Sequence, residues 1–196
     1  RIEGVSKRYD AEGSPVRALE GVSFDVEDGE FVCIVGPSGC GKTTLFRIIA
    51  GLDEATDGAV YLGDKPVEGP TPDMGVVFQE YHLFPWRTIR GNVAFGLEKA
   101  DVSDDERRTR VEELVELVGL EGFEESYPRA LSGGMKQRVA IARALAADPA
   151  LLLMDEPFGA VDAQTREMLQ RELLEIWERT GKTVLFVTHD VEEAIK

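Results

Sequence analysis

The sequence contains few cysteines, histidines and lysines. Its 196 residues include two cysteines, two histidines and seven lysines. Cys33 falls in an expected buried strand and Cys40 in a glycine-rich loop, so the two cysteines form no disulfide framework. This cysteine usage suits a reducing compartment.

Long apolar segments are also missing. No apolar run approaches the length of a bilayer span, and no charged-then-apolar leader precedes the first motif, so we expect any membrane role to come through a partner. The chain lacks an initial Met and stops at Lys196, seven residues past His189, within an expected helix; we therefore expect a trimmed fragment with its C-terminal end missing. Its 43% hydrophobic content suffices for one domain, or for a core with an inserted subdomain.

Positive charge is scarce relative to negative charge. The 37 acidic residues outnumber the 22 basic ones, which gives a net charge of −15. This charge opposes binding to a phosphate backbone, so nucleic acid is excluded as the expected partner. The basic residues are mostly arginine, and an acidic, lysine-poor surface suits either a high-salt interior or an ordinary acidic protein; the sequence leaves both open.

The most informative segment is residues 31–51. Its apolar, β-branched start at 31–35 predicts a strand, and 42–50 predicts a helix. The loop between them, GPSGCGKTT at 36–44, matches the pattern GxxxxGK[ST], in which glycines let backbone N–H groups converge on phosphate oxygens. The helix start adds unpaired amides and a favourable dipole for an anion. The alternative is a plain glycine-rich turn.

Each residue of this loop is a candidate phosphate ligand. We expect Lys42 to reach the β- and γ-phosphates of a bound triphosphate, Thr43 to ligate Mg²⁺ and Thr44 to add a second hydroxyl. The expected ligand-binding residues here are Gly36, Pro37, Ser38, Gly39, Cys40, Gly41, Lys42, Thr43 and Thr44.

Three further buried strands end in polar residues. The apolar runs at 74–78, 151–154 and 183–188 are followed by Gln79, by Asp155 and Glu156, and by His189. Ligands of open α/β sheets bind at the carboxyl ends of the strands, so these side chains are predicted to converge with the phosphate loop on one site. A loop glutamine and a structural histidine are the alternatives for Gln79 and His189.

The adjacent carboxylates have different expected roles. Asp155 can hold Mg²⁺, directly or through water, while Glu156 can orient and deprotonate an attacking water. Because they follow four buried residues, we favour function over an ordinary acidic surface for this pair.

The remaining segments give weaker signals. Residues 1–30 indicate short strands at 1–5, 17–19 and 22–26, with Tyr9 either stacking on a base or simply ending a strand. Asp57 and Gly58 predict a turn before a strand at 59–62. The aromatic-rich stretch 81–97 is either local core or a docking surface. Ser103 and Glu106 predict a capping box, and residues 103–118 predict a helix.

Two further helix starts lie later in the chain. Ser132, Gly133 and Gly134 precede a helix that could receive a phosphate or have a plain N-cap, and Asp162 can cap a helix that ends at Gly181.

Together these motifs resemble the ATP-binding subunit of an ABC transporter over nearly the whole chain. GPSGCGKTT resembles Walker A, Gln79 the Q-loop, and LSGGMKQ at 131–137 the family signature. LLLMDE at 151–156 resembles Walker B, GAVD at 159–162 the D-loop, and His189 the switch histidine. FQEYHLFPW and MDEPFGAVDAQTR are most similar to importers of the nitrate, sulfonate and taurine group. One departure is Val161, where the family usually has Leu.

The resemblance implies an α/β fold: a P-loop NTPase core with a mostly parallel sheet, an N-terminal antiparallel β layer and an inserted helical subdomain. The implied divisions are the β layer at 1–30 and 57–63, the core at 31–56, 64–79 and 148–196, and the helical subdomain with the signature at 80–147.

The resemblance to this family also implies a mechanism and partners. The ligands are ATP and Mg²⁺, with Glu156, His189 and Gln79 as catalytic residues, Thr43, Gln79 and Asp155 around the metal, and Tyr9 on adenine. Ser132 to Gly134 of a second copy would close the site in a head-to-tail dimer linked by Asp162, and a groove near Gln79 and 81–97 would receive a permease helix. The implied place is the cytoplasmic face of the membrane, with a solute-binding protein as an indirect partner.

Rival functions remain open at this point. A small-molecule kinase would share the phosphate loop without needing a Ser-Gly-Gly helix start, and a GTPase would need an NKxD-type guanine motif, which is absent. A soluble ABC-type ATPase in assembly or on DNA is the main alternative, although the charge is unsuitable for DNA. The transported solute cannot be deduced from this chain.

Overall fold

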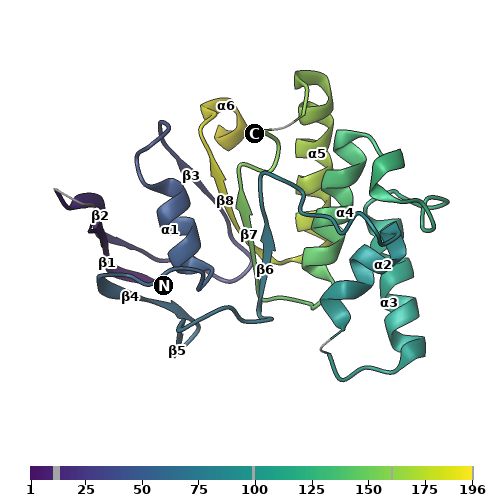
Figure 1. Ribbon diagram of the computed structural model, residues 1–196, viewed down its shortest axis with the longest axis horizontal. Helices are drawn as coiled ribbons and strands as arrows, with labels where there is room; N and C mark the ends of the chain where they lie inside the picture. The colour runs from purple at the N-terminus through teal and green to yellow at the C-terminus, as the bar shows by residue number, and fades with distance from the viewer. Residues whose placement is uncertain (11–13, 99, 160, 196) are drawn as a thin grey trace.

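The computed structural model describes residues 1–10, 14–98, 100–159 and 161–195. A parallel sheet lies at its centre (Figure 1). Its strands, in spatial order, are β3 (Phe31–Val35), β8 (Thr183–Thr188), β7 (Leu151–Asp155) and β6 (Met74–Val77). The register pairs Val35 with Thr188 and Asp155 with Val187, so these three strands end at one edge of the sheet. The residues that follow them are therefore brought to the same edge.

An antiparallel layer forms a second sheet in the order β2 (Val16–Phe24), β1 (Ile2–Tyr9), β4 (Asp57–Leu62) and β5 (Lys65–Pro66). The helix α1 (Lys42–Ile49) lies between the two sheets in Figure 1. Its buried Phe46 belongs to a core shared with Val5 of the outer layer and Leu153 of the central sheet. This packing fixes α1, and hence the loop before it, against β3.

The outer layer corrects two local predictions. Residues 16–24 form one strand where two short strands were expected, because Gly21 takes a left-handed φ of 59° and the β1–β2 register shifts rather than breaks. Asp57 and Gly58, expected to form a turn, are the first residues of β4. Gly21 and Gly58 therefore lie within strands despite their positive φ angles.

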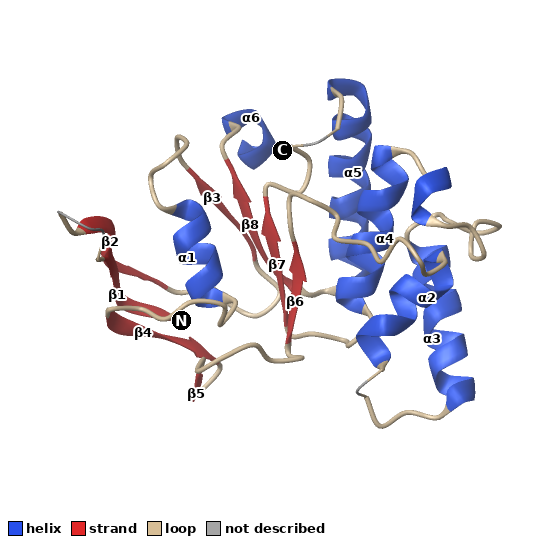
Figure 2. Ribbon diagram, in the orientation of Figure 1, coloured by secondary structure: helices blue, strands red, loops and turns tan. Residues whose placement is uncertain are grey.

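The helices gather mainly on the other side of the sheet, as the blue ribbons of Figure 2 show. They are α2 (Ile89–Ala94), the 3-10 helix η1 (Phe95–Leu97), α3 (Asp104–Leu117), the 3-10 helix η2 (Pro128–Ala130), α4 (Gly133–Leu145) and α5 (Ala163–Thr180), and a short α6 (Val191–Ile195) follows β8. The capping box predicted for Ser103 and Glu106 is present at the start of α3.

A second core holds α4 and α5 against the sheet. It joins Val139 of α4, Leu169 of α5 and Leu152 of β7. The expected combination of a parallel sheet, an antiparallel layer and a helical segment is thus confirmed, while the exact boundaries of the three parts stay a prediction. None of the helices in the described ranges has the length and apolar character that crossing a bilayer requires.

Candidate functional site

The loop between β3 and α1 has the backbone geometry of an anion site. Gly41 has a φ of 101° and caps α1 without any side-chain hydrogen bond, so the first amides of the helix are left free to point at a ligand. A Cβ at Gly41 would lie 2.5 Å from the Ala18 carbonyl oxygen, and one at Gly36 would lie 2.7 Å from Cys40 Sγ. Gly41 is therefore needed for this loop to form, whereas a side chain at position 36 would require the Cys40 thiol to move. Pro37, Ser38, Gly39 and Cys40 are exposed along its outer edge.

Lys42 closes this loop from inside. Its Nζ donates hydrogen bonds to the carbonyl oxygens of Gly36 at 2.7 Å and Pro37 at 3.1 Å, and lies 3.8 Å from Glu156 Oε1. The residue is only 8% exposed. A buried ammonium group between the loop and a carboxylate is in position to exchange these partners for phosphate oxygens.

Asp155 at the end of β7 is directed at the start of α1. The Thr43 side chain lies close enough to lower the pKa of this carboxylate, and the Oδ1 atom of Asp155 is buried without a hydrogen-bond partner among the described residues. Burial, followed by the nearby charge of Glu156, raises the pKa of Asp155, while Thr43 and Lys42 lower it. A buried, unsatisfied carboxylate oxygen beside a threonine hydroxyl is the donor chemistry that Mg²⁺ prefers, so these residues fit a magnesium ion.

Glu156 is held in an unusual backbone conformation. It has a φ of 45°, which is uncommon for a residue other than glycine, and its N–H donates to the Val187 carbonyl oxygen at 2.8 Å. Its Oε2 lies 2.9 Å from His189 Nδ1. The ends of β7 and β8 therefore bring a carboxylate and an imidazole together, with Lys42 on the other side of the carboxylate.

Gln79 lies two residues beyond the end of β6 and is exposed. A Cβ added at Gly159 would lie 3.0 Å from Gln79 Nε2, which places this amide beside the segment that follows Glu156. The next residue of that segment, Ala160, lies outside the described residues.

The segment 132–134 packs against the start of α5. Ser132 caps α4 by accepting a hydrogen bond from Met135 N at 3.3 Å. A Cβ at Gly134 would lie 2.9 Å from Thr165 Cγ2, and Asp162 caps α5 by accepting a hydrogen bond from Thr165 N at 3.0 Å. In Figure 1 the sheet separates α4 from α1, so Ser132 to Gly134 lie across the sheet from the phosphate loop of the same chain.

Tyr9 stands at the end of β1 and is 40% exposed. Its hydroxyl donates to Asp53 Oδ2 at 2.9 Å, and Lys7 Nζ lies 5.0 Å from its ring centroid. Its expected stacking on adenine stays a prediction.

Two residues of interest were missed by the sequence analysis. Arg166 lies one helical turn after Asp162, a spacing that could have signalled a shared face. Gln137 occupies the buried stripe of α4 that contains Gly134 and Ile141, where an apolar residue would be ordinary.

A glycine loop between a parallel strand and a helix, with acidic residues at the end of a neighbouring strand, defines the chain as a P-loop NTPase. Residues 19–159 match the family model described as ABC transporter, and the chain belongs to that family. It is accordingly an ATPase, and the resemblance expected from the motifs is confirmed.

Similar proteins support this membership. An ABC transporter ATP-binding protein of Methanocaldococcus jannaschii is 55% identical over 100% of this chain and 73% of its own length. The aliphatic sulfonates import ATP-binding protein of Bacillus cereus is 50% identical, over 99% of this chain and 76% of its own. The nitrate import ATP-binding protein of Synechocystis is also 50% identical, over 99% and 73%. The expected likeness to nitrate and sulfonate importers is therefore confirmed.

Solved structures agree with the fold. An ATP-binding cassette solved as a dimer with ADP and Pi has a TM-score of 0.84 and 39% identity, covering 98% of this chain and 89% of that one. The cbiO1 subunit from Clostridium perfringens, part of an ABC transporter complex, has a TM-score of 0.87 and 30% identity, covering 97% and 78%. The expected P-loop NTPase core is thus confirmed.

Proposed function

We propose that this chain is the ATP-hydrolysing subunit of an importer, and that two copies close on ATP in a head-to-tail dimer. The observation that carries the proposal is the position of Glu156, 3.8 Å from Lys42 and 2.9 Å from His189 at the edge of the sheet beside the phosphate loop. The 50% identity to sulfonate and nitrate import subunits supports the transport role, and the dimeric cassette bound to ADP and Pi supports the dimer.

In this proposal the phosphates lie on the amides of 36–43, with Lys42 turned from the loop carbonyls to the β- and γ-phosphates. Thr43 and Asp155 would hold Mg²⁺, with Gln79 near it, and the ion would neutralise phosphate charge. Glu156 accepts a proton from the attacking water, and His189 holds the Glu156 carboxylate in place.

One copy leaves the terminal phosphate open on the side away from its own α4. Ser132 to Gly134 lie across the sheet from the loop, so the same segment of a partner copy is needed to cover the phosphate. In a twofold arrangement both sites are covered at once. Asp162, which lies beside the signature at the start of α5, would link the two sites.

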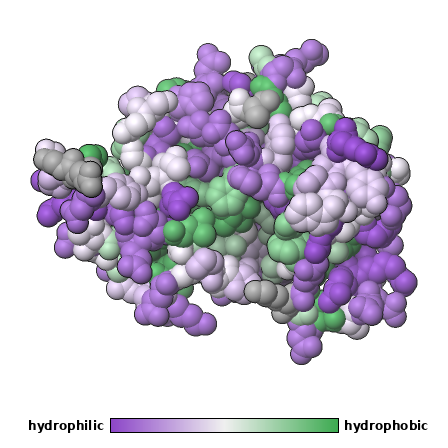
Figure 3. All heavy atoms as spheres, in the orientation of Figure 1, coloured by the Kyte–Doolittle hydropathy of each residue, from purple (hydrophilic) through white to green (hydrophobic). Residues whose placement is uncertain are grey.

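The proposed docking surface for the membrane subunits lies around 81–97. Phe84 packs on Phe95 with ring centroids 4.5 Å apart and on Trp86 at 5.6 Å, and Trp86 is 71% exposed. A neighbouring cavity of about 1210 Å³ lies between β6, η1 and α3. Figure 3 shows apolar residues near the centre of the face that Figure 1 views, within a largely hydrophilic surround. The partly exposed aromatic cluster of Phe84, Trp86 and Phe95 suits an apolar helix from a membrane subunit.

This partnership would place the chain at the cytoplasmic face of the membrane, with a solute-binding protein reached only through the permease. The docking surface is tested by co-purification from detergent-solubilised membranes of cells that carry the permease. Trp86→Ala should lose the membrane subunits while ATP binding stays unchanged. Phe123→Ala, which removes another exposed aromatic ring on the helical part, is the control and should retain them. Equal retention by both variants would contradict the assignment of this surface.

The dimer is tested with Glu156→Gln, which keeps the side chain's shape but removes the base. This variant should bind Mg-ATP, hydrolyse it poorly and elute from gel filtration as a dimer with ATP and a monomer without it. Glu178→Gln makes the same change at an exposed position of α5 and should behave like the unmodified protein. A monomer peak for Glu156→Gln at saturating ATP would refute ATP-driven closure. Phosphate release without any acceptor separates this activity from that of a kinase.

A further inference from the structure

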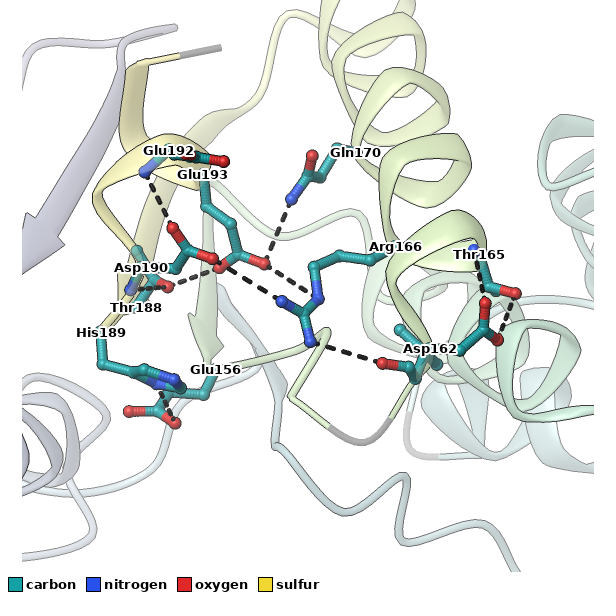
Figure 4. A network of polar contacts seen from close by, with 11 residues as sticks. Glu156, Asp162, Thr165, Arg166, Gln170, Thr188, His189, Asp190, Glu192 and Glu193 are labelled. Carbon is teal, nitrogen blue, oxygen red and sulfur yellow. Dashed lines mark hydrogen bonds and ion pairs between the residues drawn. The ribbon is translucent and has the colours of Figure 1, made fainter.

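A polar network connects the start of α5 with the segment that carries His189, as Figure 4 shows. Arg166 on α5 lies at its centre. Its Nη1 is 3.6 Å from Asp190 Oδ2, its Nε is 3.7 Å from Glu193 Oε1, and its Nη2 donates to the Val161 carbonyl oxygen at 3.4 Å. One guanidinium group therefore contacts two acidic residues that follow His189 and the residue before Asp162.

Glu193 anchors the far end of this network. Its side chain is only 7% exposed, and its carboxylate accepts hydrogen bonds from Gln170 Nε2 at 3.2 Å and from the Thr188 hydroxyl. Thr188 Oγ1 in turn accepts from Asp190 N at 3.0 Å. The two neighbours of His189 are thus fixed by side chains that converge on one buried carboxylate.

His189 itself is 54% exposed at its side chain and contacts Glu156 at 2.9 Å. The place that an exposed imidazole can reach depends on the position and the φ/ψ angles of its backbone, because these decide which rotamers are allowed. The backbone on either side is held through Thr188 and Asp190. Arg166 pairs with two of the three acidic residues of 188–193, Asp190 and Glu193.

We propose that Arg166 is a positioning residue for hydrolysis: it ties the 188–193 segment to the residue before Asp162 and thereby holds His189 against Glu156. The proposal rests on the proposed roles of His189 and Glu156. Arg166 acts through His189, so its loss should lower turnover and leave nucleotide binding intact. Val161 and Asp162 lie beside the signature segment 132–134. A movement of that segment would therefore change the contact between Arg166 and the Val161 carbonyl oxygen, and through Arg166 the position of His189.

The test measures kcat and KM for ATP, together with thermal stability, for Arg166→Ala in the full chain. We expect kcat to fall about ten- to a hundredfold, as for a misplaced catalytic group, while KM changes less than about twofold. Arg171→Ala removes an exposed arginine from the same helix, outside the network, and should change neither value. An unchanged kcat in Arg166→Ala would overturn the proposal.

Removing Arg166 leaves the buried Glu193 carboxylate without its cation, so a second variant guards against misfolding. Arg166→Lys keeps the charge but cannot reach Val161, Asp190 and Glu193 together, because one ammonium replaces a three-nitrogen fork. We expect it to keep the melting temperature and to have an intermediate kcat. If Arg166→Lys is fully stable and has the same kcat as Arg166→Ala, the proposal is supported. If Arg166→Lys has the same kcat as the unmodified protein, the three contacts of the guanidinium group do not position His189 and the proposal is overturned.

Combination with His189→Ala separates this inference from a general structural effect. If Arg166 acts through His189, adding Arg166→Ala to His189→Ala should lower kcat less than about twofold further. Full additivity of the two losses would overturn the proposal. The proposed dimer fails by a different result, a monomeric Glu156→Gln variant with ATP, so either idea can fail without the other.

Discussion

His189 Nδ1 lies 2.9 Å from Glu156 Oε2, and Lys42 Nζ lies 3.8 Å from the other carboxylate oxygen. The carboxylate is thus held between a group that would bind phosphate and a group at the end of the next strand. This arrangement restricts where Glu156 can deprotonate a water molecule. We therefore expect substitution of His189 to affect turnover and substitution of Lys42 to affect ATP binding.

His189→Ala removes the group that orients Glu156 but leaves the phosphate loop intact. We expect kcat to fall about a hundredfold, within the range for loss of a positioned acid–base partner, and the dissociation constant for ATP to change less than about twofold. Steady-state kinetics and fluorescent-nucleotide titration measure the two quantities. The control is His82→Ala, which removes an exposed imidazole located after β6. Loss of ATP affinity in His189→Ala, with kcat preserved, would be the opposite of this expectation.

Lys42→Ala removes the buried ammonium of the phosphate loop. Hydrogen bonds to charged groups contribute about 1.5–3 kcal/mol, so we expect ATP affinity to fall roughly ten- to two-hundredfold. Lys65→Ala, on an exposed position of β5, is the matched control. Isothermal titration calorimetry of both variants checks the result. Unchanged affinity in Lys42→Ala would mean that the lysine stays with the Gly36 and Pro37 carbonyl oxygens when ATP binds.

Asp155→Asn separates metal binding from stability. Burial raises the pKa of Asp155, so the folded chain keeps this proton to a higher pH than the unfolded chain does. The stabilisation from protonation is complete below the ordinary aspartate pKa of about 3.9 and is lost as pH rises through the raised value. At neutral pH the charged carboxylate therefore destabilises the nucleotide-free fold.

We accordingly expect Asp155→Asn to raise the free energy of unfolding at pH 7, and with it Tm, relative to the unmodified protein. The difference from the unmodified protein should shrink as the pH is lowered. The rise in Tm on adding Mg-ATP should be smaller in the variant, because a ligand of the metal is weakened. Thermal melts from pH 4 to 8, with and without Mg-ATP, test both statements. A lower Tm for the variant at pH 7 would show that the carboxylate stabilises the fold.

The sequence was most informative where the residues of a motif lie in a single loop, strand end or helix start. The glycine loop, the acidic end of β7 and His189 after β8 could be predicted because buried parallel strands have recognisable apolar runs and end at one edge. The capping box at Ser103 was equally local. These features depend on a few neighbouring residues, and the structure places them as expected.

Contacts between distant segments could not be predicted in this way. The bend at Gly21 depends on pairing with β1, so local turn signals suggested two strands where the structure has one. The pairing of Arg166 with Glu193 joins residues 27 positions apart and depends on how α5 packs beside β8. Side-chain burial in α4 likewise depends on which face of the helix packs against the sheet. The burial of Gln137 could therefore not be predicted from the sequence.

Gln137 is a buried polar residue of α4. Its side chain is 0% exposed, and neither its Oε1 nor its Nε2 has a hydrogen-bond partner among the described residues. An unsatisfied buried amide costs about 1–3 kcal/mol, and methionine has nearly the same shape without polar atoms. Gln137→Met should therefore raise the free energy of unfolding by about 1 kcal/mol, or roughly 2–4 °C in Tm. Gln164→Met, at an exposed position of α5, should leave Tm unchanged. If Gln137→Met instead lowers Tm, the amide has partners that stabilise the fold, and the stripe of α4 behind the signature is held by hydrogen bonds rather than by apolar packing alone.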